Sequence, residues 1–461
     1  MTLSASDPRT NQHGAGTGRT PLPPPGGSPR GVGYDSAVAR IRIARDGTVQ
    51  PHARLQRAEA TGVFAALAVP GYARLWVSGW LWNLTRWMAV FLGSYLVNRL
   101  SGSPLLVQLV GAAFFAPMFF GGILGGVISD RFDRRRTIMT QLAALVPVAL
   151  LMAALVIGGA VRVWMVYPFM LAVGIGGVLD MTSRRALVFD LVGAERVTNA
   201  MALEAMAQTG GTMIGTLLGG AITNVVGIGY AFLLIALAYA AAWLALLGLP
   251  RPAGATTSGA RPSLRRDVVA GLAYVRREPA IIGILGVTVF MNLCYFTYLP
   301  LVPVFAERLG ANAFWAGALA SAAGCGALVG SMLVAAFVPE RIGRGWTYIA
   351  GAGLAMSGLL GFAFAPWYPL AWVALAVAGL GQAGFASLQG ALILLAAQAD
   401  MRGRAMGVLS MAIGVLPFGM VLLGLTAQVT DPTVAVSVSA LLGLAGLLGW
   451  TARAPALRAI R

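Results

Sequence analysis

Long apolar stretches, separated by short polar loops, run along most of the chain after residue 70. Each holds close to the ~20 residues that a helix needs to cross a hydrocarbon core of ~30 Å. The pattern predicts an all-α membrane protein with twelve transmembrane helices. We place them near residues 73–97, 104–128, 137–159, 163–183, 199–225, 228–249, 280–305, 314–338, 346–365, 368–395, 404–427 and 433–451.

The longest internal loop divides these segments into six plus six. Its first part is rich in Pro and Gly, which predicts a linker, and its second part places Leu264, Val268, Leu272 and Val275 on one stripe, which predicts an interfacial helix. The expected organisation is a disordered tail (1–70), a six-helix bundle (71–249), a linker with an interfacial helix (250–279), a second six-helix bundle (280–452) and a short tail (453–461).

Composition supports the membrane assignment. Of 461 residues, 58% are hydrophobic and only 11% are charged, whereas soluble domains carry about 25% charged residues. All 33 basic residues are arginines, and they gather in alternate loops. Only Arg99, Arg162 and Arg308 fall on the opposite side, and Arg86 lies inside a segment. Because cytoplasmic loops carry the excess of arginine, we expect both termini in the cytoplasm and a multi-pass protein of a bacterial plasma membrane.

Other functional classes are disfavoured. The net charge of +17 is spread over alternate loops and not over one face, so we expect no nucleic-acid partner. The sequence has no phosphate-binding loop of the Walker type and no Cys/His cluster with metal-ligand spacing. Both histidines, His13 and His52, lie in the tail, which excludes a serine–histidine triad within the membrane. We therefore expect no enzyme activity, cofactor or metal.

A strongly positive hinge, Asp-Arg-Phe-Asp-Arg-Arg-Arg at residues 130–136, joins the second and third segments. A hinge of this charge should stay on the cytoplasmic side, and its side chains can clamp helix ends, as a gate requires. A degenerate copy of residues 126–134 occurs at residues 336–344, after the eighth segment, and predicts a duplicated six-helix unit. The predicted gating residues are Gly126, Asp130, Arg131, Asp133, Arg134 and Arg135.

With these motifs the chain resembles the major facilitator superfamily of transporters over about residues 70–455. Residues 183–200, which include Ser183-Arg184-Arg185 and Asn199-Ala200, are similar to those of a bacterial exporter branch that includes enterobactin- and macrolide-efflux proteins. The antiporter motif G-x-x-x-G-P-x-x-G-G matches residues 211–220, with Thr216 in place of proline. The resemblance implies two pseudo-symmetric six-helix bundles and export of a small molecule.

Three ionisable side chains fall inside the predicted segments, where they are costly and default to functional candidates. We predict Glu204 in the fifth segment as the proton-coupling acid and Arg86 in the first as its partner. A purely structural ion pair between the two segments remains an alternative. Asp180 is predicted to bond Arg184 or Arg185 at an interface or gate.

Polar residues recur at helical spacing, so each pair shares one helix face. The resemblance implies that segments one, four, seven and ten line the substrate cavity, although interhelical hydrogen bonding would explain the same spacing. The cavity candidates are Asn83, Gln208, Asn292, Tyr295, Gln382 and Gln389.

Glycines recur every four residues in the fifth segment, at Gly211, Gly215 and Gly219, followed by Gly220. Small residues let membrane helices approach closely, for static packing or for sliding surfaces.

The sequence therefore predicts a secondary active transporter that exports a small drug- or siderophore-like amphipathic molecule by alternating access and proton antiport. Its expected partners are the small-molecule substrate, protons and membrane lipid, and its expected working unit is a monomer. Two alternatives stay open: an importer or uniporter of a small nutrient on the same fold, and a transport-dead scaffold or receptor.

Overall fold

The structure is a computed structural model that describes residues 64–131, 133–249, 264–341, 343–398 and 401–460, with side chains described except at 120–131, 194, 264–269 and 337–341. Most of the expected tail and linker therefore lies outside the described residues. Within these ranges every regular element is a helix, which confirms the all-α fold class.

The first half of the chain holds one short 3-10 helix and five long helices. They are η1 (Ala65–Ala68), α2 (Tyr72–Ser101), α3 (Pro104–Arg131), α4 (Arg134–Ile157), α5 (Val163–Val225) and α6 (Ile228–Leu247).

The second half begins with a helix where one was expected and is divided more finely; the interfacial location of that helix stays a prediction. Its elements are α7 (Leu264–Val275), α8 (Pro279–Phe290), η2 (Met291–Tyr295), η3 (Phe296–Leu301), α9 (Val302–Arg308), α10 (Ala313–Arg341), α11 (Arg344–Ala363), α12 (Tyr368–Ala396), α13 (Arg402–Ile413), α14 (Leu416–Val429), α15 (Pro432–Ala452) and α16 (Pro455–Arg458).

By length and composition, nine stretches of the described residues could cross a membrane. The twelve predicted spans thus stay a prediction in number. The nine stretches are Arg134–Ile157, Val163–Gly193, Ile228–Leu247, Pro279–Arg308, Ala313–Ala336, Arg344–Ala363, Tyr368–Ala396, Arg402–Val429 and Pro432–Ala452.

Helix α5 departs from the predicted break between the fourth and fifth segments. The sequence predicts a loop at 184–198, whereas helical structure continues through this interval. The residue with non-helical angles inside α5 is Gly193, with φ 68° and ψ 178°. Glycine adopts a positive φ because it has no Cβ, so the chain turns here without a loop. The predicted break therefore exists, but as a kink at Gly193 in place of a loop, because arginines mark where a helix leaves the apolar layer and not where it ends.

The seventh and eleventh predicted segments are not single regular α-helices. Residues 291–295 form a π-helix and residues 296–301 a 3-10 helix, and α13 ends at Ile413 before α14 begins at Leu416. Pro300 and Pro417 lie at these irregularities. Proline has no N–H to donate to the carbonyl four residues earlier, which accounts for both interruptions.

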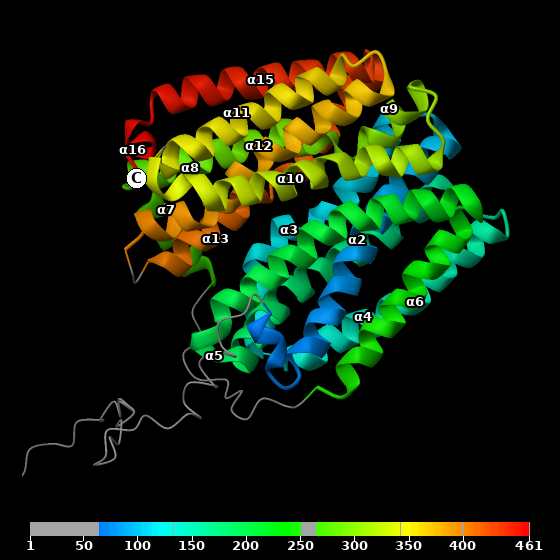
Figure 1. Cartoon of the computed structure of the whole chain (residues 1–461), viewed down its shortest axis with the longest axis horizontal. Coiled ribbons are helices and arrows are strands. Elements are labelled where there is room, and N and C mark those ends of the chain that lie inside the picture. Colours follow the sequence, from blue (N-terminus) through cyan, green and yellow to red (C-terminus); the bar gives the residue numbers. More distant parts are fainter. Residues whose placement is uncertain (1–63, 132, 250–263, 342, 399–400, 461) are drawn as a thin grey trace, which may run out of the picture. The chain divides into compact units, whose positions relative to one another are not determined.

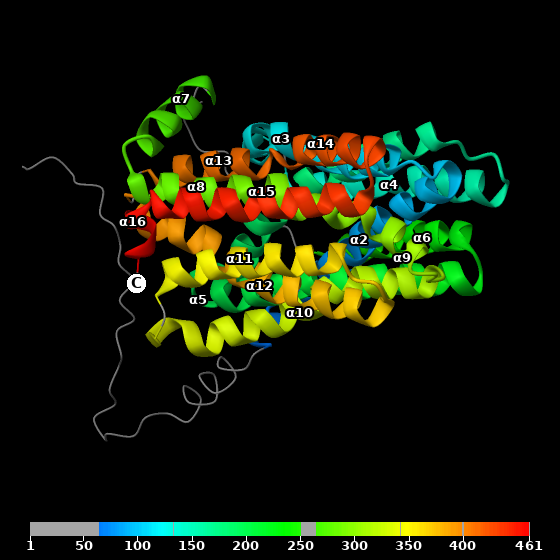
Figure 2. The same ribbon diagram turned by 90° about the horizontal axis from the view of Figure 1, so that it is seen from above.

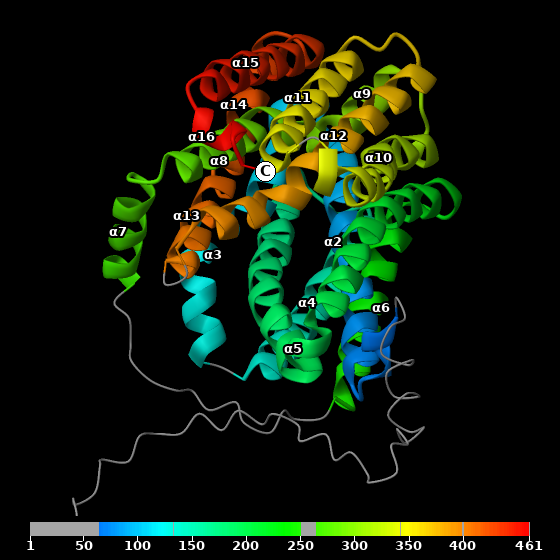
Figure 3. The same cartoon turned by 60° about the vertical axis from the view of Figure 1, so that its left-hand side comes forward.

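The two halves repeat one packing pattern. In the first half α4 packs on α5 and α6, and in the second half the equivalent helix α11 packs on α12 and α15. Figure 1 and Figure 2 both show α10, α11, α12 and α15 running side by side. The halves meet where α10 packs on α5 and α14 packs on α3, with α3 and α5 visible beside α13 and α2 in Figure 3.

We call the end of the bundle at which α2 begins, α3 ends and α4 begins the hinge end. The opposite end, where α2 ends at Ser101 and α3 begins, is called the far end.

Candidate functional site

The described part of the hinge ties three helix ends together. Asp133 caps α4, because its carboxylate accepts a hydrogen bond from the Arg136 backbone N–H at 2.9 Å. This is the usual work of aspartate at a helix N-terminus, where backbone N–H groups lack helical partners. Arg134 forms an ion pair with Asp190 of α5. Gly126, Asp130 and Arg131 belong to α3, but the Asp130 and Arg131 side chains lie outside the described part of the structure.

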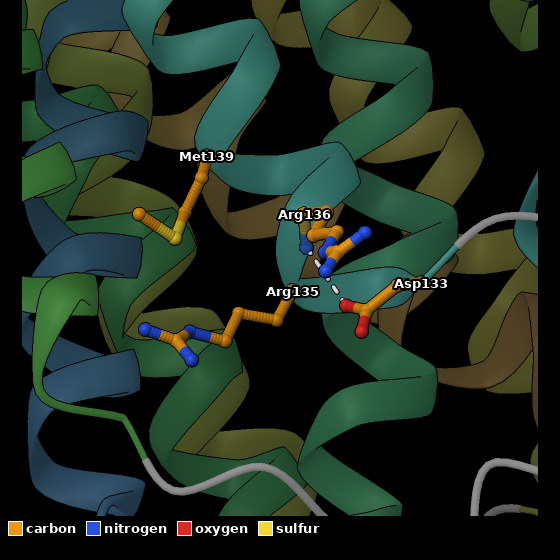
Figure 4. Close-up of a pocket in the computed structure, with 4 residues that line it drawn as sticks. All are labelled: Asp133, Arg135, Arg136 and Met139. Atoms are coloured by element: carbon orange, nitrogen blue, oxygen red, sulfur yellow. Dashed lines mark hydrogen bonds between the residues drawn. The ribbon is translucent and has the colours of Figure 1, made fainter.

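Arg135 caps the C-terminal end of α6. Its guanidinium donates to the Leu246 carbonyl at 3.1 Å and to the Leu247 carbonyl at 2.7 Å. Arg74 of α2 donates to the Gly248 carbonyl beside them. Cations are favourable at this end of a helix, where the last carbonyls carry the negative end of the dipole. Figure 4 shows Arg135 extending away from Asp133, whereas Arg136 lies beside it.

An ion pair buried between α2 and α5 forms the centre of the first half. Arg184 donates to Asp180 through Nε at 2.9 Å and Nη2 at 2.7 Å, and through Nη1 to the Leu75 carbonyl at 2.8 Å. Asp180 and Arg184 are each 4% exposed. Gln141 of α4 donates to Asp180 at 3.2 Å. Bidentate geometry with extra hydrogen bonds is what makes burial of such a pair tolerable.

Glu204 joins this cluster through a gap that Gly79 leaves in α2. A Cβ built on Gly79 would lie 3.1 Å from Arg184 Nη1 and 3.5 Å from Glu204 Oε2. The Tyr72 hydroxyl interacts with the Glu204 carboxylate and donates to the Ala200 carbonyl at 3.0 Å. The other carboxylate oxygen, Oε1, is buried and has no hydrogen-bond partner in the described part of the chain.

Arg86 does not pair with Glu204, contrary to the predicted partnership. Its guanidinium donates to Asn83 at 3.0 Å and lies over the Trp87 ring at 5.2 Å. The ion pairs between described residues do not include Arg86, and its Nε has no partner there. The sequence could not decide this, because Glu204 meets α2 at Gly79, two helical turns before Arg86.

Four of the six cavity candidates come together in the second half. Tyr295 of the π-helix donates to Gln382 of α12 at 3.2 Å. Gln389, two turns farther along α12, donates to the Thr288 hydroxyl at 3.0 Å, and Asn292 donates to the Thr288 carbonyl at 2.9 Å.

Sequence reasoning missed two members of this network. The Tyr348 hydroxyl of α11 lies 3.0 Å from the Thr288 hydroxyl, and both residues are fully buried. Thr288 falls four residues before Asn292, so helical spacing could have identified it. No comparable signal marks Tyr348, because its partners come from other helices.

The remaining two candidates lie in the first half. Asn83 is buried, and its side chain donates to the Gly79 carbonyl at 2.9 Å. Gln208 is exposed, one turn after Glu204 on α5.

The predicted packing glycines of α5 face two different helices. A Cβ on Gly211 or Gly215 would meet α2 backbone within 2.8 Å, and one on Gly219 would meet the Met88 side chain at 3.1 Å. Gly220 faces α10, where a Cβ would lie 2.4 Å from the Ala313 carbonyl oxygen. The stripe of Gly211, Gly215 and Gly219 thus packs α5 within its own half, and the adjacent Gly220 packs the two halves together.

Hydrogen bonds between the described residues of the two halves gather toward the far end. Asn98 donates to Glu307, and the Ser103 hydroxyl lies 2.6 Å from the Gln428 side-chain oxygen. Deeper in the bundle, Gln108 donates to the Thr297 carbonyl at 2.8 Å. These bonds join α2 and α3 to the helices of the second half, so the far end is closed.

The described residues hold no group of three or more His, Cys, Asp or Glu side chains placed to bind a metal ion.

The sequence matches a known protein family over most of its length. The family model described as Major Facilitator Superfamily matches residues 75–417. The Enterobactin exporter EntS of Shigella flexneri is 26% identical over 240 residues, which is 50% of this chain and 52% of that protein. The match therefore spans about half the length of that relative.

Solved structures resemble the chain over most of its length. A D-xylose-proton symporter matches with a TM-score of 0.65 and 17% identity, over 82% of this chain and 96% of that one. A bacterial homologue of the human lysosomal transporter Spinster, in an inward-facing and unoccupied conformation, matches with a TM-score of 0.61 and 15% identity, over 84% and 95% of the two chains. At these identities the likeness concerns the fold.

Proposed function

Because this chain belongs to the Major Facilitator Superfamily, a family of membrane transporters, we propose that it exports a small amphipathic molecule, drug- or siderophore-like, by alternating access coupled to proton antiport. The observation that carries the proposal is the carboxylate of Glu204, which lies beside the buried Asp180–Arg184 pair and has one buried oxygen without a hydrogen-bond partner among the described residues. Ionisable groups within a membrane are expensive and mark coupling sites in pumps and transporters.

The direction of transport rests on the relative and on the charge pattern. The relative with 26% identity is an exporter, and the glycine motif of α5 follows the antiporter pattern with Thr216 in place of proline. Arginine-rich loops support a cytoplasmic location for the hinge end and both termini. The far-end closure then seals the outer side, and the conformation is the one that receives substrate from the cytoplasm.

In this proposal the hinge controls the cytoplasmic side. The Arg134–Asp190 pair joins α4 to α5, and Arg135 fastens α6 to the start of α4. The first half thereby moves as one body when the two halves rock against each other. Gly126, Asp130 and Arg131 complete the gating motif by resemblance.

Coupling follows from competition for one oxygen. A proton and a cationic group of the substrate compete for the Glu204 carboxylate, because a nearby positive charge favours its deprotonated form, and this competition gives antiport. Arg184, held in place beside Gly79 by its ion pair with Asp180, supplies a fixed positive charge near the deprotonated Glu204 carboxylate. Arg86 serves as a second buried cation whose partner is Asn83. Asp180 positions Arg184 and does not itself carry the transported proton.

The substrate would bind between Asn83 and Gln208 of the first half and the network around Tyr295 of the second. That network offers amide and hydroxyl groups beside aromatic rings, since Tyr348 stacks on Phe385 at 5.2 Å. A few placed polar groups on a mostly apolar wall are typical of small-molecule sites.

The test uses purified protein in liposomes that hold a pH-sensitive dye and an imposed proton gradient. Siderophores, macrolides and cationic dyes are added in turn. We expect substrate-triggered proton movement that is lost in Glu204→Gln and kept in Glu195→Gln, a matched change of an exposed carboxylate on the same helix. Proton movement of equal size in both variants would refute the coupling role.

The two alternatives give different results in the same vesicles. Downhill transport that persists after the proton gradient is collapsed identifies an importer or uniporter. A scaffold or receptor moves no substrate under any condition, and removal of residues 1–63 abolishes its role while leaving a transporter active.

A further inference from the structure

A groove between α4 and the first part of α5 lies outside the charge cluster. It has a volume of about 780 Å³, within the usual range for small-molecule sites. Its lining is polar near the hinge, at Arg136 and Thr140, and apolar farther along, at Val148 and Ile175. From Arg136 to Val148 the helix rises by roughly 18 Å at 1.5 Å per residue. The groove therefore suits an elongated molecule with a polar head and one apolar tail.

Arg136 supplies a positive charge that the described residues leave unused. The two preceding arginines are committed, Arg134 to Asp190 and Arg135 to the end of α6. Asp133 lines the same groove, but its carboxylate accepts from the Arg136 backbone N–H, and no ion pair or side-chain hydrogen bond from Arg136 is found among the described residues. The Arg136 side chain is exposed at the mouth of the groove. It also lies in the first turn of α4, where the helix dipole favours an anion. Its chemistry matches a phosphate group.

Gln141 supplies an unused acceptor deeper in the groove. The side chain is only 5% exposed, its nitrogen is bonded to Asp180, and its oxygen has no partner. This oxygen lies against Gly176 at the floor of the groove, which both residues line, since a Cβ on Gly176 would lie 3.5 Å from it. A buried amide oxygen without a donor costs about 1–3 kcal/mol. A hydroxyl held roughly 7.5 Å along the helix from Arg136 would satisfy it.

We propose that this groove binds a lysophospholipid from the surrounding membrane, with its phosphate on Arg136, its free glycerol hydroxyl on Gln141 and its single acyl chain along Val148 and Ile175. A two-chain phospholipid has that hydroxyl esterified and offers Gln141 no donor. A single-chain amphiphile without phosphate leaves Arg136 unpaired. The bound lipid would also fix the Gln141 amide that holds Asp180, so the site can influence the buried ion pair. The inference stands apart from the direction and coupling of transport.

The test measures binding to the full-length protein in detergent by native mass spectrometry. The probes are lysophosphatidic acid, two-chain phosphatidic acid, a monoacylglycerol and an alkyl phosphate that lacks the hydroxyl. We expect one saturable lysophosphatidic acid per protein, with a Kd at least tenfold below that of each other probe.

Variants separate this site from general lipid adhesion. Ile175 is 48% exposed and Leu237 on α6 is 57% exposed, so tryptophan at either place leaves the core intact. We expect Ile175→Trp to raise the Kd at least tenfold and Leu237→Trp to leave it unchanged. Arg136→Gln should weaken every phosphate-bearing probe, while Arg453→Gln, at another exposed arginine, should not.

Gln141→Leu should remove the preference for lysophosphatidic acid over the alkyl phosphate. Equal binding by the Ile175→Trp and Leu237→Trp variants, or equal binding of the one-chain and two-chain lipids, would overturn the proposal. Because the readout is binding, a failure of the transport proposal leaves this result unaffected.

Discussion

Substitution of Gly317 by alanine should open the far end of the protein. Gly317 of α10 faces α5, where a Cβ would lie 2.5 Å from the Thr216 carbonyl oxygen and 2.9 Å from the Gly220 Cα atom. Both neighbours are backbone atoms and cannot rotate away. Restoring ordinary contact requires the two helices to separate by roughly 1 Å, because real interiors are close-packed.

The magnitude follows from the cost of overpacking. An extra methyl in a well-packed contact costs about 1–3 kcal/mol. In the proposed alternating-access cycle only the far-end-closed state contains this contact, so the whole cost falls on that state. A cost of ~2 kcal/mol lowers its population relative to the open state by a factor of ~30, at 1.4 kcal/mol per tenfold. Transport should slow by a comparable factor, because each cycle must pass through the closed state.

The assay follows the distance between spin labels at Ser101 and Val429, exposed positions at the far ends of the two halves, with Cys294 and Cys325 replaced by serine. Gly449→Ala is the matched control, because a Cβ there meets nothing within 4 Å and the gain in helix propensity is the same. An unchanged distance distribution in Gly317→Ala, together with normal flux, would refute the assignment of this contact to far-end closure.

Three further changes test other parts of the structure. Gly79→Ala places a methyl 3.1 Å from Arg184 Nη1, and we expect several-fold slower proton-coupled flux at a normal yield of folded protein. Arg135→Gln removes the bonds to the end of α6 and should cost about 1–3 kcal/mol of stability, read as a lower melting temperature. Hydrogen bonds from Arg308 lower the pKa of Asp431 from 3.8 to about 2. Since the folded pKa is the lower one, this stabilisation is present above pH 3.8 and is lost as the pH falls through about 2. The pair is solvent-exposed, so Asp431→Asn should cost less than ~1 kcal/mol at pH 7, and the difference in melting temperature from the parent should shrink at pH 3.

Much of the architecture was predictable because membrane insertion depends on the local sequence of each segment. Apolar length indicated membrane helices, the helical structure of α7 was expected from one stripe, and the glycine stripe of α5 was expected to pack closely. The pairing of Asp180 with Arg184 was among the expected bonds because the two are four residues apart on one helix. Each of these inferences needed only the spacing of residues along one element.

Contacts between distant helices were less accessible. Arg86 and Glu204 were expected to pair because both are charged and buried. In the structure Arg86 donates a hydrogen bond to Asn83, and Glu204 lies beside Arg184 at Gly79. Tyr348 joined the polar network without any sequence signal. Which charges meet depends on how α2 and α5 are rotated and where Gly79 leaves room, and this is set by the packing of every helix around them.

The sequence by itself determined that this is a helical membrane protein with two related halves, a charged hinge and costly charges inside its helices. Hydrophobic length and charge asymmetry act on each segment separately as it enters the membrane, so these properties can be derived one segment at a time. Only the tertiary structure decided which end is closed, which carboxylate oxygen stays unpartnered, and that Gln141 offers a buried acceptor to a groove. Those features depend on gaps of a few ångströms between helices, which no single segment encodes.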